Sequence, residues 1–169
     1  MNGGTVTQAG TVGTVASSWV IAGTDANGHI IWRNSSNGAV VIWDMNGFTV
    51  SQTHSVGSVA SSWDIVGAGD FDGDGSVDLL FRNSSNEAVA IWFLTNGTFT
   101  RSASVATVPN IWSIDLAGDF NGDGRSDIVW TNTDNGARAI WFMNGAVVTA
   151  ANSLGSVANT WVIQSKAAE

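Results

Sequence analysis

Two short segments of this chain concentrate carboxylates at regular spacing. The segment GDFDGDGSVD, residues 69–78, places four aspartates within nine positions, and GDFNGDGRSD, residues 118–127, repeats the pattern with one asparagine. Only 12% of the chain is charged, and seven of its 14 acidic residues lie in these two segments. Carboxylates held this close repel one another unless a cation neutralises them. The spacing therefore indicates a metal-binding loop that occurs twice.

Calcium suits these loops best, because it takes six to eight oxygen ligands at about 2.3–2.6 Å. Alternating aspartates aim their side chains into a curling loop, and Gly75 permits the sharp turn. One asparagine replaces an aspartate in the second loop, so we expect weaker binding there. The sequence thus predicts two Ca²⁺ ions per chain. The ligands of the first are the side chains of Asp70, Asp72, Asp74 and Asp78 with the carbonyl of Ser76, and those of the second are the side chains of Asp119, Asn121, Asp123 and Asp127 with the carbonyl of Arg125.

Other interpretations of the acidic loops stay open. Each segment can be a solvated Gly/Asp-rich hairpin that holds no ion. Magnesium fits less well than calcium, because it usually keeps several waters and is held by fewer carboxylates.

Both loops belong to an internal repeat of 49 residues. The five residues that the first repeat lacks fall between Trp19 and Arg33, where TDANG stands in place of the acidic loop. We therefore expect no metal in that repeat, and the blade can form without the loop. The period shows in tryptophans at intervals of 44, 49 and 49 residues, which are Trp19, Trp63, Trp112 and Trp161.

Each repeat is expected to form four short strands. In the second repeat these are residues 63–66, 79–83, 88–94 and 98–108, and the unbroken apolar start of LLFRN predicts burial on both faces. The pair Asn96-Gly97 is a strong signal for a tight hairpin turn. Four antiparallel strands per repeat of this length are typical of a β-propeller blade, so the chain is predicted to be all-β with about three and a half blades.

The repeat also sets the expected division of the chain. Residues 1–169 form a single repeat domain, because every segment falls in one blade or another. Its parts are an outer strand of a partial blade (1–15), a blade without the acidic loop (16–59), two blades with calcium loops (60–108 and 109–157) and the first strand of a further partial blade (158–169).

The stretches GDFDGDGSVDLLFRN and GDFNGDGRSDIVWTN carry a family resemblance. The repeat resembles the FG-GAP/VCBS family, the calcium-bearing propeller repeats of integrin α heads and of many bacterial secreted and surface proteins. The resemblance spans nearly the whole chain and implies an extracellular or cell-surface setting. Because the first repeat departs from the motif, no metal ligand carries over to it.

Composition excludes several classes of partner. The net charge of −8 leaves no basic patch for phosphates, so nucleic acid is not an expected ligand. No apolar run is long enough to span a membrane, and the absence of cysteine excludes disulfides and thiolate metal sites.

The tryptophans, histidines and strand-end asparagines are assigned structural roles. Nine tryptophans allow stacking against sugars, but their fixed repeat positions favour contacts between blades. The asparagines of the Arg-Asn and Thr-Asn pairs are expected to cap turns, with a polar ligand pocket as the alternative. His29 and His54 are read as isolated surface residues. No nucleophile motif accompanies them, so the protein is predicted not to be an enzyme.

Three complete repeats are too few to close a propeller of about four to eight blades. Unpaired blade edges are aggregation templates, so the ring is expected to be completed by homo-oligomerisation, with a dimer as the simplest case. The leading interpretation is a calcium-binding scaffold or adhesion module with a glycan or protein ligand. The alternatives are a carbohydrate-binding lectin and an engineered or excised fragment without independent function.

Overall fold

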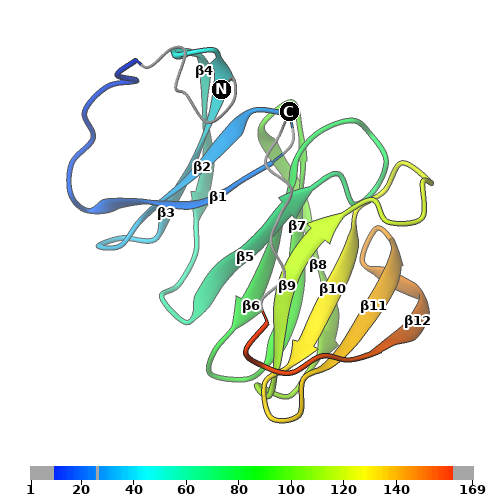
Figure 1. The fold of residues 1–169 in the computed structure, drawn as a ribbon. Helices are drawn as coiled ribbons and strands as arrows, with labels where there is room; N and C mark the ends of the chain where they lie inside the picture. Colours follow the sequence, from blue (N-terminus) through cyan, green and yellow to red (C-terminus); the bar gives the residue numbers. More distant parts are fainter. Residues whose placement is uncertain (1–9, 26, 162–169) are drawn as a thin grey trace, which may run out of the picture.

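The computed structural model of the protein describes residues 10–25 and 27–161, and this part of the chain is built from strands (Figure 1). Twelve strands form three four-stranded antiparallel sheets, each with its strands in sequence order. The predicted all-β fold of four-stranded blades is therefore confirmed. The strands are β1 (Trp19–Thr24), β2 (His29–Asn34), β3 (Ala39–Asn46), β4 (Thr49–Ser58), β5 (Trp63–Gly69), β6 (Asp78–Asn83), β7 (Ala88–Thr95), β8 (Thr98–Thr107), β9 (Trp112–Gly118), β10 (Asp127–Asn132), β11 (Ala137–Asn144) and β12 (Val147–Ser156).

We call the sheets blade 1 (β1–β4), blade 2 (β5–β8) and blade 3 (β9–β12). They follow one another along an open arc and do not close a ring (Figure 1). The predicted strand at 1–15 and the predicted strand at 158–169 fall largely outside the described residues. No helix in the described ranges could cross a membrane.

The second strand of each blade is the most buried. In β6 the run from Asp78 to Phe81 is buried without interruption, as predicted, because neighbouring blades cover both of its faces. The strand starts one residue earlier than predicted, and β5 runs on to Gly69 rather than ending at Val66. The β7–β8 turn is a tight one, with φ of 49° at Asn96 and 73° at Gly97.

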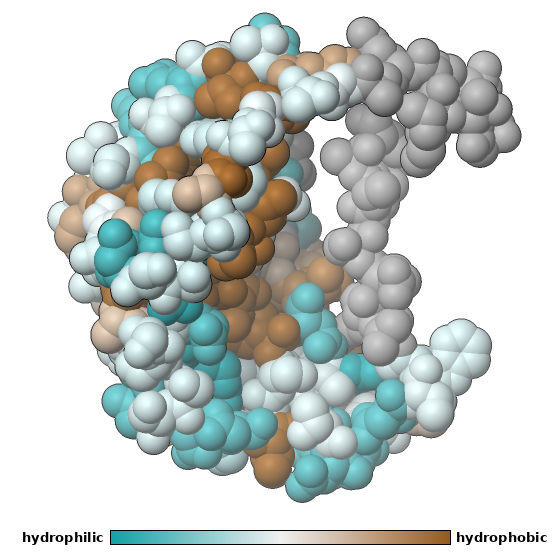
Figure 2. Space-filling view, turned by 90° about the vertical axis from the view of Figure 1, so that its left-hand side faces the viewer, coloured by the Kyte–Doolittle hydropathy of each residue, from teal (hydrophilic) through white to brown (hydrophobic). Residues whose placement is uncertain are grey.

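Hydrophobic cores form between blades. One core joins the faces of blades 1 and 2 and contains Ile42 and Phe81, while the other joins blades 2 and 3 and contains Phe71 and Trp130. Figure 2 shows hydrophobic side chains along the hollowed side of the molecule, bordered by polar ones.

Several of the repeated aromatic residues pack into these cores, as expected, among them Trp63, Trp92, Trp112 and Trp141. Trp130 is buried and its ring centroid lies 4.9 Å from that of Trp141, and Phe81 lies 4.8 Å from Trp92 in the same way. Trp161 differs, with 70% of its surface exposed.

The strand-end asparagines cap turns as predicted. The side-chain oxygens of Asn34, Asn83 and Asn132 each accept an N–H from the residue two positions on.

Candidate metal centre

The two acidic loops connect the first and second strands of blades 2 and 3. Loop A, residues 70–77, follows β5, and loop B, residues 119–126, follows β9. The first aspartate of each loop folds it by accepting N–H bonds. In loop A, Asp70 Oδ1 accepts from Gly73 at 2.6 Å and Oδ2 from Gly75 at 2.7 Å. Both glycines have φ near +80°, a conformation that side chains rarely adopt, which explains the G-D-G pattern.

Asp78 anchors loop A to the core. Its side chain is fully buried, and its two oxygens accept N–H bonds from Phe71 and Leu94, both at 2.9 Å. Burial raises the pKa of Asp78 to about 7, helped by the charges of Asp72 and Asp70 and opposed by the two N–H bonds. A carboxyl group held in this way favours a nearby cation, because a cation restores the charged form.

Three of the predicted ligands of loop A converge. Asp70, Asp72 and Asp78 each offer an oxygen, and these oxygens lie within 4.8 Å of one another. Asp72 Oδ2 accepts a bond from Arg101 at 3.0 Å, but its Oδ1 is buried and has no hydrogen-bond partner. A buried acceptor without a donor is costly, so the donor set fits a calcium ion.

Asp74 and Ser76 lie at the rim of this cluster. Asp74 Oδ1 accepts the Ser76 N–H at 2.7 Å, and Oδ2 accepts the hydroxyl of Thr95 at 3.0 Å. Although burial opposes it, these bonds hold the pKa of Asp74 below its ordinary value. Asp74 is therefore ionised but does not join the three converging carboxylates.

The first aspartate of loop B and the aspartate that follows the loop accept backbone N–H bonds as their equivalents at loop A do. Asp119 accepts N–H bonds from Gly124 and Gly122, which lower its pKa. Asp127 anchors the loop as Asp78 does, accepting from Phe120 at 3.1 Å and Met143 at 2.9 Å.

Two further contacts involve residues of loop B that belong to the predicted ligand set. The side-chain nitrogen of Asn121 donates to Asp123 Oδ2 at 3.2 Å, and the Arg125 side chain lies beside Gly73 of loop A. Within the described residues, loop B does not gather three carboxylates as loop A does. The second ion thus stays a prediction from sequence.

Loop A also joins two blades. Its Asp70 carbonyl accepts the Ser126 N–H at 2.6 Å, and its Phe71 carbonyl accepts the Gly145 N–H at 2.9 Å. An ion that orders loop A would therefore also order the contact between blades 2 and 3.

Blade 1 has no acidic loop, and a backbone carbonyl takes the place of the anchoring carboxylate. The N–H of Met45, which corresponds to Leu94 and Met143 in the other blades, donates to the Gly28 carbonyl at 3.1 Å instead of to a carboxylate. His29 stands at the start of β2, where the other blades carry Asp78 and Asp127.

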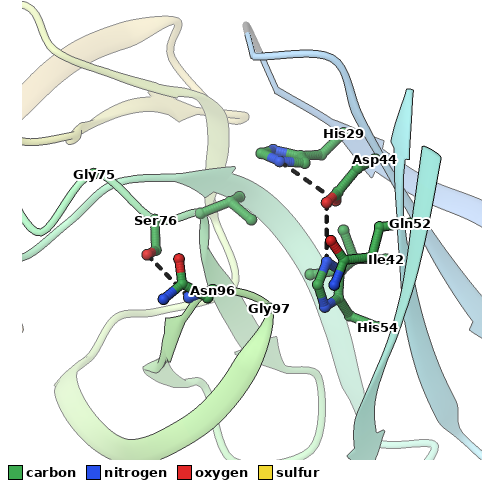
Figure 3. Close-up of a pocket in the computed structure, with 10 residues that line it drawn as sticks. His29, Ile42, Asp44, Gln52, His54, Gly75, Ser76, Asn96 and Gly97 are labelled. Carbon is green, nitrogen blue, oxygen red and sulfur yellow. Dashed lines mark hydrogen bonds and ion pairs between the residues drawn. The ribbon is translucent and has the colours of Figure 1, made fainter. Parts of the chain in front are cut away.

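The prediction that the two histidines are isolated is wrong. His29 and His54 both face Asp44, with Nε2 atoms 3.5 Å and 2.9 Å from its two oxygens (Figure 3). Adjacent strands of one sheet bring them together, which sequence distance conceals. Comparison of equivalent positions could have revealed the cluster, because blade 2 carries Phe93 and Ala103 where blade 1 carries Asp44 and His54.

Comparison with known families agrees with this architecture. Residues 70–130 match the model of the FG-GAP-like repeat, a segment that begins at loop A and ends in β10 after loop B. No curated protein matches the chain in sequence. Residues 70–130 therefore carry an FG-GAP-like repeat on neighbouring β-propeller blades.

Proposed function

We propose that the protein is a non-enzymatic, calcium-binding β-propeller module that acts as a self-assembling scaffold for binding or adhesion. The observation that carries the proposal is the convergence of Asp70, Asp72 and Asp78 around the unpartnered Oδ1 of Asp72. Calcium at this point would supply fixed positive charge and no chemistry on a substrate. FG-GAP repeats are typical of extracellular proteins, where millimolar calcium fills sites of modest affinity.

The outward face of blade 3 supports self-assembly. Val56 of blade 1 and Val105 of blade 2 each pack against the following blade, but Leu154, the equivalent residue of blade 3, is 55% exposed. Leu154 therefore lies on the face that the following blade covers in blade 1 and in blade 2.

The outward face of blade 1 is the complementary half of the same contact. Ile65 of blade 2 is buried against blade 1, whereas its equivalent Ile21 is 58% exposed. The two open faces therefore match as the two sides of one blade–blade interface. A second copy of this chain is the partner we propose, because it presents both faces.

Calcium titration followed by native mass spectrometry tests the proposal. The wild type is expected to bind calcium as an oligomer, and Asp72→Asn is expected to lose the loop A ion. Asp134→Asn, which changes an exposed turn residue, is the matched control. A protein that binds no calcium at millimolar concentration would overturn the metal proposal, and a calcium-bound monomer would overturn the assembly proposal.

A lectin is the second candidate, favoured by two equivalent cavities. One, of about 200 Å³ in blade 1, is lined by Trp19, Trp32 and Trp43. The other, of about 250 Å³, is lined by their blade 3 equivalents Trp112, Trp130 and Trp141. Indole rings grouped in this way offer apolar faces on which a sugar ring can stack.

A glycan array separates the lectin from the scaffold. Blade 2 carries Phe81 at the central position, so Trp32→Phe and Trp130→Phe remove only the N–H and part of the ring. Sugar binding that both variants lose would support the lectin. Absence of binding to any glycan would argue against the lectin and favour the scaffold function.

A further inference from the structure

Arg101 connects strand β8 to the acidic cluster of loop A. Its Nη2 donates to Asp72 Oδ2 at 3.0 Å, although the two residues lie 29 positions apart in the sequence. Its guanidinium carbon lies 3.5 Å from the centre of the Phe93 ring, which is buried in the core between blades 2 and 3. A cation held over an aromatic face is attracted to it, which restricts its position. Arg101 therefore presents its N–H group to loop A from a defined place.

The bond to Arg101 determines how the Asp72 carboxylate is turned. A charge-assisted hydrogen bond to Oδ2 also sets the direction of Oδ1, because both oxygens belong to one rigid group. Oδ1 is buried and has no hydrogen-bond partner among the described residues. Asp72 also supplies one of the three oxygens that lie within 4.8 Å of one another. The oxygen that Arg101 does not hold is thus the one left for an ion.

Loop B lacks both members of this pair. Asn121 stands where loop A has Asp72, and Ala150 of β12 stands where β8 has Arg101. The side chain of Asn121 donates to Asp123 instead. The two loops therefore differ in the ligand and also in the residue that holds it.

We propose that Arg101 is a positioning residue for the calcium site of loop A, where it holds the Asp72 side chain so that Oδ1 faces the ion. The inference rests on the proposed calcium binding and adds a reason why loop A binds more strongly than loop B. Hydrogen-bond partners of a ligating carboxylate typically change metal affinity by about 10- to 100-fold. Arg101 acts through Asp72 and is not itself a ligand.

The positive charge of Arg101 acts in the opposite direction. It repels a calcium ion, so a purely electrostatic role would make calcium bind more tightly once Arg101 is removed. The Arg101 side chain is 51% exposed, and water and salt screen a charge in such a position. We therefore expect the loss of orientation to outweigh the relief of repulsion. The sign of the change in affinity separates the two roles.

Calorimetry with calcium tests this sign. The parent protein carries Asp123→Asn, which removes a predicted ligand of loop B, so that loop A is the site measured. Arg101→Gln and Arg101→Ala introduce the residues that β4 and β12 carry at the equivalent position. Each is expected to lower the calcium affinity of the parent by about tenfold or more. Arg33→Gln, which removes a positive charge paired with Asp64, should leave the affinity unchanged.

Terbium luminescence supplies a readout that a purely structural role would not change. Terbium binds oxygen ligands as calcium does, and its decay times in H₂O and D₂O count the waters bound to the ion. When Asp72 turns away, a water takes its place among the oxygens around the ion. Both Arg101 variants are therefore expected to show about one more bound water than the parent.

The pair can also be built into loop B. In a chain that carries Asp72→Asn, so that loop A is impaired, Asn121→Asp restores the carboxylate and Ala150→Arg adds the residue proposed to hold it. The two changes together are expected to bind calcium about tenfold more tightly than Asn121→Asp alone. Such a gain cannot arise from damage to the fold.

The outcomes distinguish the positioning role from calcium binding itself. Unchanged or higher calcium affinity in the folded Arg101 variants, or an unchanged number of bound waters, would overturn the positioning role and leave calcium binding in place. Equal affinity of the Asn121→Asp protein with and without Ala150→Arg would do the same. A parent protein that binds no calcium at millimolar concentration would overturn the calcium proposal and this inference with it. Circular dichroism of each variant shows whether it is folded.

Discussion

Phe71 and Phe120 occupy the same place in consecutive repeats, yet Phe71 is completely buried and Phe120 is 47% exposed. Phe71 lies in the core that joins blades 2 and 3, together with Ile128 and Met143. Nothing in the described residues covers Phe120 in the same way. Both phenylalanines stand in the same Gly-Asp-Phe-x-Gly-Asp-Gly pattern, so the difference in their exposure shows what a following blade contributes.

We predict that Phe120→Asp and Leu154→Asp reduce self-association. Each places a charge on the open face of blade 3, where burial against another blade would leave it unpaired. Sedimentation velocity should show a shift toward monomer of at least tenfold in the dissociation constant. Ile21→Asp should act in the same way from the other face.

Val147→Asp is the matched control for this prediction. Val147 is 64% exposed, and the equivalent residues Thr49 and Thr98 are also exposed although a blade follows each of them, so this position does not contribute to a blade–blade contact. Equal association of wild type and all the face variants would contradict the proposed interface.

Two glycines make a second matched pair. A Cβ added to Gly69 would fall 2.2 Å from Ser126 Oγ of blade 3, whereas one added to the equivalent Gly118 meets only the Phe120 ring at 3.8 Å. We expect Gly69→Ala to destabilise the monomer by about 1–3 kcal/mol and Gly118→Ala by less than about 0.5 kcal/mol. Chemical denaturation measures both, and equal losses would mean that the blade contact is not rigid.

The blades and loops could be predicted from sequence, because both rest on local spacing. The aspartates and glycines of loop A predict a metal site, and three of the four aspartates converge in the structure. The double hydrogen bonding of Asp78 could not be foreseen, since Leu94 lies 16 residues away in the sequence, near the end of the neighbouring strand β7. The sequence does not distinguish among the aspartates of this segment, whereas burial in the structure makes Asp78 the residue that anchors the loop.

The same limit explains the misread histidines. Neither His29 nor His54 belongs to a recognisable motif. Strand register brings them together. It places His29 opposite Asp44, and it places His54 of β4 opposite Ile42, two residues before Asp44 on β3. Only the fold supplies that relation.

The raised pKa of Asp78 predicts a pH-dependent calcium affinity. The folded protein holds a proton up to about pH 7 that the unfolded chain, with a pKa of 3.8, has released. The calcium-free protein therefore loses stability as pH rises from about 4 to 7. Calcium must expel that proton, so its apparent affinity at pH 6 should be about tenfold lower than at pH 8.

Calorimetry in buffers of different ionisation enthalpy measures this release. We expect about one proton per calcium bound to loop A at pH 6 and almost none at pH 8. Asp74→Asn should keep the pH dependence, because Asp74 is ionised at both values. The same affinity and no proton release at both pH values would show that Asp78 is already charged.

The anchor aspartate of loop B gives a prediction that does not depend on metal. Asp127 accepts N–H bonds from Phe120 and Met143 on its two oxygens. Asparagine offers one acceptor, so Asp127→Asn leaves one of these N–H groups facing an NH₂ group. We expect a loss of about 1–3 kcal/mol in the free energy of unfolding, measured with a chelator present. Asp134→Asn, on an exposed turn, should change the stability by less than about 0.5 kcal/mol. If Asp127→Asn had the same free energy of unfolding as the wild type in the absence of calcium, the carboxylate would be needed only to bind the ion and not to stabilise the blade.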